Sequence, residues 1–99
     1  MIARDTLEQI LQRFEFLEAS MSEGTGDLAT LGRDYAALRP VAEQARGYLA
    51  LVDGMAEAKA LLSDPEMVAL AEEELADLRA RRPEAEREMR VALLPKYMV

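Results

Sequence analysis

Apolar residues recur at alternating steps of three and four along three long segments of this 99-residue chain, and this spacing strongly constrains its fold. Steps of three or four residues bring side chains to one face of an α-helix. Strong helix formers, chiefly Ala, Leu, Glu and Arg, dominate the composition. The sequence therefore predicts an all-α fold with helices at about 5–23, 27–62 and 64–94.

Turn residues separate the three apolar stripes. The Gly-Thr-Gly sequence at 24–26 predicts the first turn, because glycine readily adopts the left-handed conformation that ends a helix. The Ser-Asp-Pro-Glu sequence at 63–66 predicts the start of the third helix, since it supplies a side-chain acceptor followed by proline. Asp5 and Glu8 have the spacing of a capping box at the start of the first helix.

The second stripe continues through a proline. Its members are Leu28, Leu31, Tyr35, Leu38, Ala42, Ala45, Leu49, Val52 and Ala56. Proline inside a helix removes one backbone hydrogen bond and clashes with the preceding turn, at about 3 kcal/mol. Pro40 therefore predicts a second helix that is kinked or split, and the third helix is expected to continue with a kink at Pro83.

Short connections make successive helices alternate in direction. The predicted architecture is an elongated antiparallel three-helix bundle with coiled-coil-like seams, forming one domain over residues 1–99. A slender bundle of this kind rarely encloses a cleft for chemistry.

Composition excludes several kinds of reactive site. Cys and His are both absent, which removes thiolate and imidazole chemistry and the commonest zinc ligands. Glu73 and Asp77 share a helical face, but a solvated acidic face explains them more simply than a cation site. We assign no catalytic, cofactor-binding or metal-binding residue, and we expect no cofactor and no enzymatic activity from this chain alone.

The net charge of −7 is concentrated in one segment. From Asp53 to Asp77, eight acidic residues accompany a single base, Lys59, whereas the rest of the chain balances eleven acids against eleven bases. Such a segment repels nucleic acid and attracts a basic protein. No segment approaches the roughly 20 apolar residues of a membrane span, so no membrane or DNA partner is expected and a cytoplasmic location fits the absence of Cys.

Five arginines form a basic stretch in the third predicted helix: Arg79, Arg81, Arg82, Arg87 and Arg90. Pairs such as Asp77–Arg81 and Glu86–Arg90 have the spacing that stabilises a helix. The stretch is therefore interpreted either as helix-stabilising ion pairs or as a surface that faces RNA.

Several motifs resemble one known family. They are Leu-Leu-Ser-Asp-Pro-Glu-Met at 61–67, Leu-Ala-Glu-Glu-Glu-Leu at 70–75, Leu-Leu-Pro-Lys at 93–96 and Leu-Gly-Arg-Asp-Tyr-Ala-Ala-Leu at 31–38. Together they are similar to the N-terminal helical domain of bacterial class I peptide chain release factors, especially the type that reads UAA and UAG. The resemblance covers nearly the whole chain and is weakest at the first helix.

The resemblance implies a role in translation termination on the ribosome. In the family, peptidyl-tRNA hydrolysis depends on a Gly-Gly-Gln loop, and stop-codon reading depends on a separate domain. This sequence has no Gly-Gly-Gln, so the catalytic and codon-recognition domains are expected to lie outside it. The implied partners are ribosomal stalk-base proteins or rRNA and the class II release factor GTPase.

Two alternatives stay open. The family continues Leu-Leu-Pro-Lys with Asp-Pro, whereas this chain reads Tyr-Met-Val at 97–99, which fits a fragment, a truncated product or a changed reading frame. The alternative function is a free-standing helical adaptor that pairs with partner helices through an exposed apolar stripe.

Overall fold

The computed structural model describes residues 2–97, and the surroundings of side chains from 2 to 94. Within that range there are three α-helices and no strand: α1 (Arg4–Glu23), α2 (Leu28–Leu61) and α3 (Val68–Tyr97). The predicted all-α fold is confirmed. The divergent end of the chain at Met98 and Val99 lies outside the described residues.

The first helix does not begin with a capping box. Ala3 occupies the N-cap position in an extended conformation, and no side chain accepts a hydrogen bond there. Asp5 is already helical and lies in the first turn, where a carboxylate is favoured by the helix dipole. The capping-box prediction from Asp5 and Glu8 is therefore wrong. The helix begins one residue earlier than predicted, at Arg4, whose side chain is held by Asp53.

The turn between α1 and α2 follows the prediction. Gly24 has φ 72°, and its N–H donates to the Met21 carbonyl at 3.2 Å, so α1 ends in a left-handed residue. Asp27 is the N-cap of α2, and its Oδ1 accepts hydrogen bonds from the N–H groups of Ala29 (3.1 Å) and Thr30 (3.4 Å). This cap starts α2 at Leu28.

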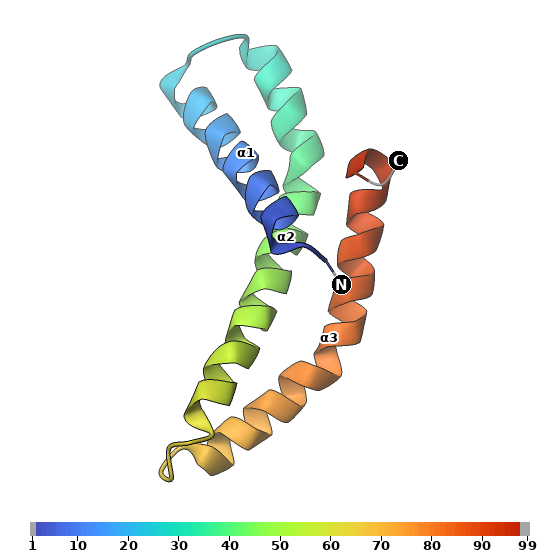
Figure 1. The fold of residues 1–99 in the computed structure, drawn as a ribbon. Helices are drawn as coiled ribbons and strands as arrows, with labels where there is room; N and C mark the ends of the chain where they lie inside the picture. Colours follow the sequence, from blue (N-terminus) through green and yellow to red (C-terminus); the bar gives the residue numbers. More distant parts are fainter. Residues whose placement is uncertain (1, 98–99) are drawn as a thin grey trace.

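Helix α2 runs through Pro40 as one helix of 34 residues. Its axis changes direction near the middle, as Figure 1 shows, which is the kinked form of the two expected at Pro40. Helix α3 likewise continues through Pro83 and changes direction partway along its length (Figure 1).

Regular α3 begins four residues later than the predicted boundary at 64. Asp64 Oδ1 accepts the Glu66 N–H at 2.9 Å, as an N-cap side chain does. The Met67 N–H donates to the Asp64 carbonyl at 3.0 Å, an i to i+3 bond that makes this a tight first turn. The start signal was read correctly, but the α-helical hydrogen-bond pattern begins only at Val68.

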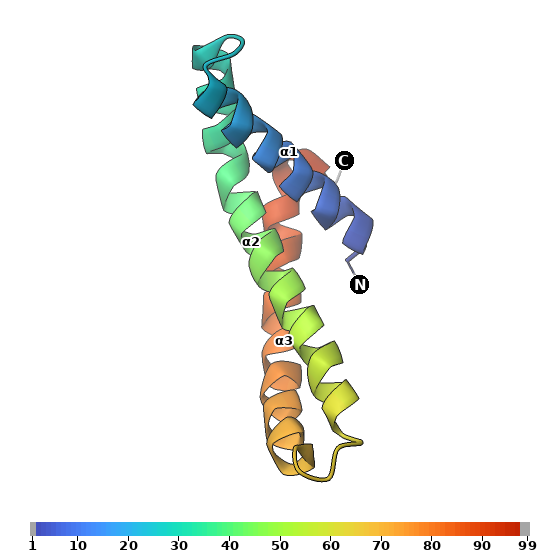
Figure 2. The ribbon, with the colours of Figure 1, turned by 90° about the vertical axis from the view of Figure 1, so that its left-hand side faces the viewer.

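Helix α2 is the axis of the molecule. Figures 1 and 2 show α1 antiparallel to the first half of α2, and α3 antiparallel to its second half and rising beside its middle. Within residues 2–97, α1 and α3 each pack against α2 but their backbones do not approach each other closely. The molecule measures 55 × 31 × 17 Å, and its radius of gyration of 17.1 Å exceeds the roughly 13 Å of a compact 100-residue domain. The expected elongated shape is confirmed.

Two separate clusters of buried side chains hold this arrangement. We call the larger one the body core; it comprises Leu7, Ile10, Phe14, Leu17, Leu38, Val41, Ala42, Ala45, Tyr48, Met89 and Leu93. We call the smaller one the arm core; it comprises Leu51, Met55, Ala58, Leu75 and Leu78. The body core joins all three helices, whereas the arm core joins only α2 and α3.

The buried stripe of α2 changes face along the helix. In the first half, the predicted Leu38, Ala42 and Ala45 are buried. In the second half, the buried positions are one residue earlier than predicted, so that Met55 is buried and Ala56 is exposed. This shift arises because α1 and α3 cover different faces of α2, and a single stripe cannot describe both.

Candidate interaction surfaces

The connection between α2 and α3 carries an exposed acidic surface. We call it the acidic tip; it comprises Glu57, Asp64, Glu66, Glu72, Glu73 and Glu74. Asp53 and Asp77, at the limits of the predicted acidic segment, pair with Arg4 and Arg81. The six acids of the tip form no ion pair within the described part of the chain. The tip therefore presents uncompensated negative charge.

Apolar side chains lie among these acids. Leu70 is 59% exposed, and Leu61 and Leu62 are also exposed. A small hollow of about 90 Å³ lies between the two helices here, lined by Gly54, Glu57, Ala58, Leu61, Met67, Leu70, Ala71 and Glu74. The tip thus combines an apolar centre with an acidic rim, an arrangement that suits a protein partner carrying basic residues.

The basic stretch of α3 is largely neutralised by its own helix. Arg81 pairs with Asp77 at 3.2 Å, as the spacing predicted. Arg87 Nε donates to Glu84 Oε2 at 3.1 Å. Because these arginines already have carboxylate partners, the stretch has little free positive charge to exchange for the counterions of RNA. The geometry favours the interpretation as helix-stabilising pairs.

A polar cluster centred on Glu86 joins α2 to α3. The Tyr48 hydroxyl donates to Glu86 Oε1 at 3.1 Å. Arg82 Nε lies 3.6 Å and Arg90 Nη1 lies 3.9 Å from the oxygens of the same carboxylate. Burial raises the pKa of the Tyr48 phenol, and the hydrogen bond to Glu86 raises it further. This is a structural cross-link between α2 and α3, because three partners share one carboxylate.

A second long-range contact fixes the start of α1. Arg4 Nη1 and Nη2 donate to the two oxygens of Asp53 in α2, at 3.0 and 3.2 Å. Hydrogen bonding by Arg4 holds the pKa of Asp53 below its ordinary value. Sequence reasoning missed both this pair and the Tyr48–Glu86 bond, since partners 49 and 38 residues apart leave no local signal.

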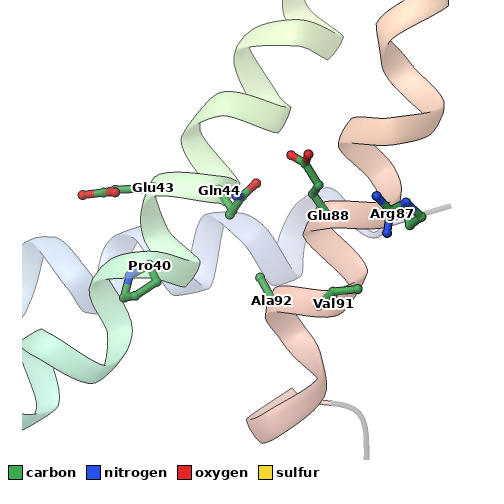
Figure 3. Close-up of a pocket in the computed structure, with 7 residues that line it drawn as sticks. All are labelled: Pro40, Glu43, Gln44, Arg87, Glu88, Val91 and Ala92. Atoms are coloured by element: carbon green, nitrogen blue, oxygen red, sulfur yellow. The ribbon is translucent and has the colours of Figure 1, made fainter.

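A shallow groove runs between α2 and α3. Its larger hollow, about 520 Å³, is shown in Figure 3 and is lined by Pro40, Glu43, Gln44, Arg87, Glu88, Val91 and Ala92. A second hollow of about 330 Å³ continues it and shares Gln44 and Glu88. In Figure 3 Glu43 points away from α3, so the groove is open rather than enclosed.

Reactive clusters are not found in the part of the chain that the structure describes. No three His, Cys, Asp or Glu residues among residues 2–97 gather closely enough to hold a metal ion, so Glu73 and Asp77 belong to no such group. No described helix is long and apolar enough to cross a bilayer. The assignment of no catalytic or ligand-binding residue stays a prediction.

The family of the chain follows from its relatives. The model of the PCRF domain matches residues 6–98. The chain belongs to the PCRF domain family. The PCRF domain described here is 53% identical to peptide chain release factor 1 of Ruegeria pomeroyi, over 97% of this chain and 28% of the relative. It is 50% identical to peptide chain release factor 1 of Dinoroseobacter shibae, over the same shares.

A third relative carries the same name as the first two. The PCRF domain is 46% identical to peptide chain release factor 1 of Roseobacter denitrificans, again over 97% of this chain and 28% of the relative. The resemblance to class I release factors is therefore confirmed, and the chain spans 28% of the length of these relatives. No solved structure matches this chain significantly.

Proposed function

We propose that this chain is the ribosome-contacting N-terminal domain of a peptide chain release factor and acts in translation termination in the cytoplasm. The match of the PCRF domain to residues 6–98, in relatives named peptide chain release factor 1, carries the proposal. The chain alone releases no peptide. The sequence lacks Gly-Gly-Gln, which supports this proposal. Among the described residues, the groove between α2 and α3 is open, and arginines such as Arg81 are paired with carboxylates of their own helix.

The acidic tip is the part of the domain that meets the ribosome. Its six unpaired acids surround exposed leucines, which suits a basic protein at the stalk base better than rRNA, whose phosphates the tip would repel. Contact with the class II release factor GTPase is a second role, made from the same end of the rod.

Release activity is tested by adding the purified chain to ribosomal complexes halted at a stop codon, with a labelled peptide on the tRNA. No peptide release above background is expected, while a full-length release factor in parallel gives complete release. Stop-codon-dependent release by the chain alone would contradict the absence of hydrolysis.

Ribosome contact is tested by co-sedimentation with large ribosomal subunits. One variant changes Glu57, Glu66, Glu73 and Glu74 of the tip to Gln. A matched control changes Asp5 to Asn and Glu15, Glu23 and Glu88 to Gln, and each of these acids is exposed and unpaired within the described residues. Both variants move the net charge from −7 to −7 + 4 = −3. Binding should weaken in the tip variant only; equal weakening in both would refute a docking role for the tip.

The adaptor interpretation has its own signature. An adaptor that pairs through an apolar stripe would use the exposed Val91 and Leu94 beside the α2–α3 groove. A stable dimer in analytical ultracentrifugation, together with no ribosome binding by the wild-type chain, would favour it over the release-factor domain.

A further inference from the structure

The body core and the arm core meet at a narrow waist. The last body-core residue of α2 is Tyr48, and the first arm-core residue is Leu51. Below this level the buried cluster is the arm core, which α2 and α3 form without α1. The waist is therefore the level at which one buried cluster ends and the other begins, with the partly buried Ala85 packed against both.

Both helices carry a helix-weakening residue at this level. Gly47 of α2 is exposed, and an added Cβ would meet nothing within 4 Å, so no close packing requires a glycine there. Glycine in a helix costs about 1 kcal/mol relative to alanine, because its backbone has more freedom to lose. Pro83 of α3 has no N–H to donate to the carbonyl of Arg79, so one helical hydrogen bond is missing.

The two weak points lie side by side. The 330 Å³ hollow of the groove is lined by Gly47 and Leu51 from α2 and by Arg81, Glu84 and Ala85 from α3, which bracket Pro83. The Tyr48–Glu86 bond ties the helices together at the same level. The direction of α3 changes in its orange part in Figure 1. A hollow between the helices leaves room for them to bend together.

One contact spans the waist along the rod. Arg4 belongs to the body through α1, whereas Asp53 lies beyond Leu51 in the arm. Their side chains are about half exposed. Exposed ion pairs are weak and are screened by salt, so this contact can hold a position without locking it.

We propose that the arm, residues 51–80, pivots on the body about a hinge formed by Gly47 and Pro83, and that the Arg4–Asp53 pair holds the arm in the observed position. From the hinge at Gly47 to the end of α2 at Leu61 the distance is about 21 Å at 1.5 Å per residue. A bend of about 20° at the hinge therefore carries that end of the arm sideways by about 7 Å. The hinge is a property of the isolated chain and does not depend on the proposed function.

Because the chain contains no cysteine, a pair of spin labels can be placed uniquely. Gln12→Cys in the body and Ala69→Cys in the arm report the body–arm distance by pulsed electron spin resonance, and both positions are exposed. Gln12→Cys with Ala36→Cys gives a reference pair that lies within the body. The body–arm pair is expected to have the broader distance distribution.

Gly32→Ala is the matched control for Gly47→Ala. Both glycines lie in α2, and at both an added Cβ meets nothing within 4 Å, but Gly32 is far from the waist. Gly47→Ala and Pro83→Ala should narrow the body–arm distribution toward that of the reference pair, and Gly32→Ala should leave it unchanged. Asp53→Ala should broaden it, as should high salt in the wild-type chain.

Two results would overturn the hinge, and a third would overturn the restraint. A wild-type body–arm distribution as narrow as the reference pair would exclude the motion. Equal narrowing by Gly32→Ala and Gly47→Ala would place the flexibility elsewhere. No change with Asp53→Ala would remove the restraint from the proposal. Circular dichroism of each variant shows that the helices are intact, so that a change in width reports motion and not unfolding.

Discussion

The Tyr48 hydroxyl in α2 donates a 3.1 Å hydrogen bond to Glu86 Oε1 in α3, at the level where the body core gives way to the arm core. The phenol ring is buried in the body core, so the hydroxyl must find its partner at the edge of that core. Glu86 supplies it and remains partly solvated, with 21% of its side chain exposed. This bond links α2 to α3 at the boundary between the two cores.

Tyr48→Phe should lower the free energy of unfolding by about 1 kcal/mol, the usual net value of one hydrogen bond. Glu86 keeps Arg82 and Arg90 as partners, which limits the loss. Tyr35→Phe is the control, because the Tyr35 hydroxyl donates a longer bond, of 3.4 Å, to Glu18 at an exposed position, where the net value of the bond is smaller. Urea unfolding measures both variants. If both variants lost the same free energy of unfolding, the Tyr48–Glu86 bond would stabilise the protein no more than the exposed Tyr35–Glu18 contact does.

The raised pKa of Tyr48 predicts how the free energy of unfolding changes at alkaline pH. Burial, and then the bond to Glu86, raises the pKa of Tyr48 above its ordinary value of 10.0. The folded state thus favours the neutral phenol, so its contribution is complete below pH 10 and is lost as pH rises through the folded-state pKa. The urea midpoint of the wild-type chain should fall more steeply above pH 10 than that of Tyr48→Phe. Parallel curves would show that the phenol titrates equally in both states.

Acid should weaken the start of α2 through its N-cap. A hydrogen bond from the Thr30 hydroxyl, at 2.8 Å, and bonds from two backbone N–H groups lower the pKa of Asp27 below its ordinary value of 3.8. This contribution is present above pH 3.8 and is lost as pH falls through the folded-state pKa. Asp27→Ala should lower the thermal midpoint at neutral pH, since the cap is removed.

Asp27→Asn separates the cap from its charge. Asn caps a helix about as well as Asp but does not titrate, so this variant should keep most of the neutral-pH midpoint and lose part of its acid dependence. Thermal unfolding followed by circular dichroism between neutral and acid pH measures both effects. If the thermal midpoint of Asp27→Asn fell with pH as that of the wild-type chain does, carboxylates other than Asp27 would be the cause of the acid dependence.

Local signals in the sequence were sufficient to place most helix ends. Gly24, Asp27 and Asp64 act through neighbours within five residues, so their roles follow from residue type and spacing. The spacing of Asp5 and Glu8 gave a wrong capping box, because α1 begins at Arg4 with no side-chain cap. The long-range partner of Arg4, Asp53, is 49 residues away and leaves no local signal.

The surface features also divide into those that local sequence signals predict and those that depend on long-range packing. The acidic tip and the Asp77–Arg81 pair were predictable, because charge density and i,i+4 spacing are properties of the chain itself. The α2–α3 groove and the Glu86 cluster were not, because they depend on how two helices face each other. The shift of the buried stripe from Ala56 to Met55 has the same origin, since α1 and α3 cover different faces of α2.

The two glycines that flank the waist should respond differently to alanine. At Gly47 an added Cβ meets nothing within 4 Å, so Gly47→Ala should raise the free energy of unfolding by up to about 1 kcal/mol. At Gly54 the new Cβ would lie 3.3 Å from Leu78 Cδ1, tighter than ordinary van der Waals contact, in the middle of the arm core. Gly54→Ala should therefore gain less than Gly47→Ala, or destabilise the protein, because Leu78 must move to admit the methyl group. Urea unfolding of the two variants ranks them. A larger gain at Gly54 would mean that the arm core is loose enough to absorb a methyl group.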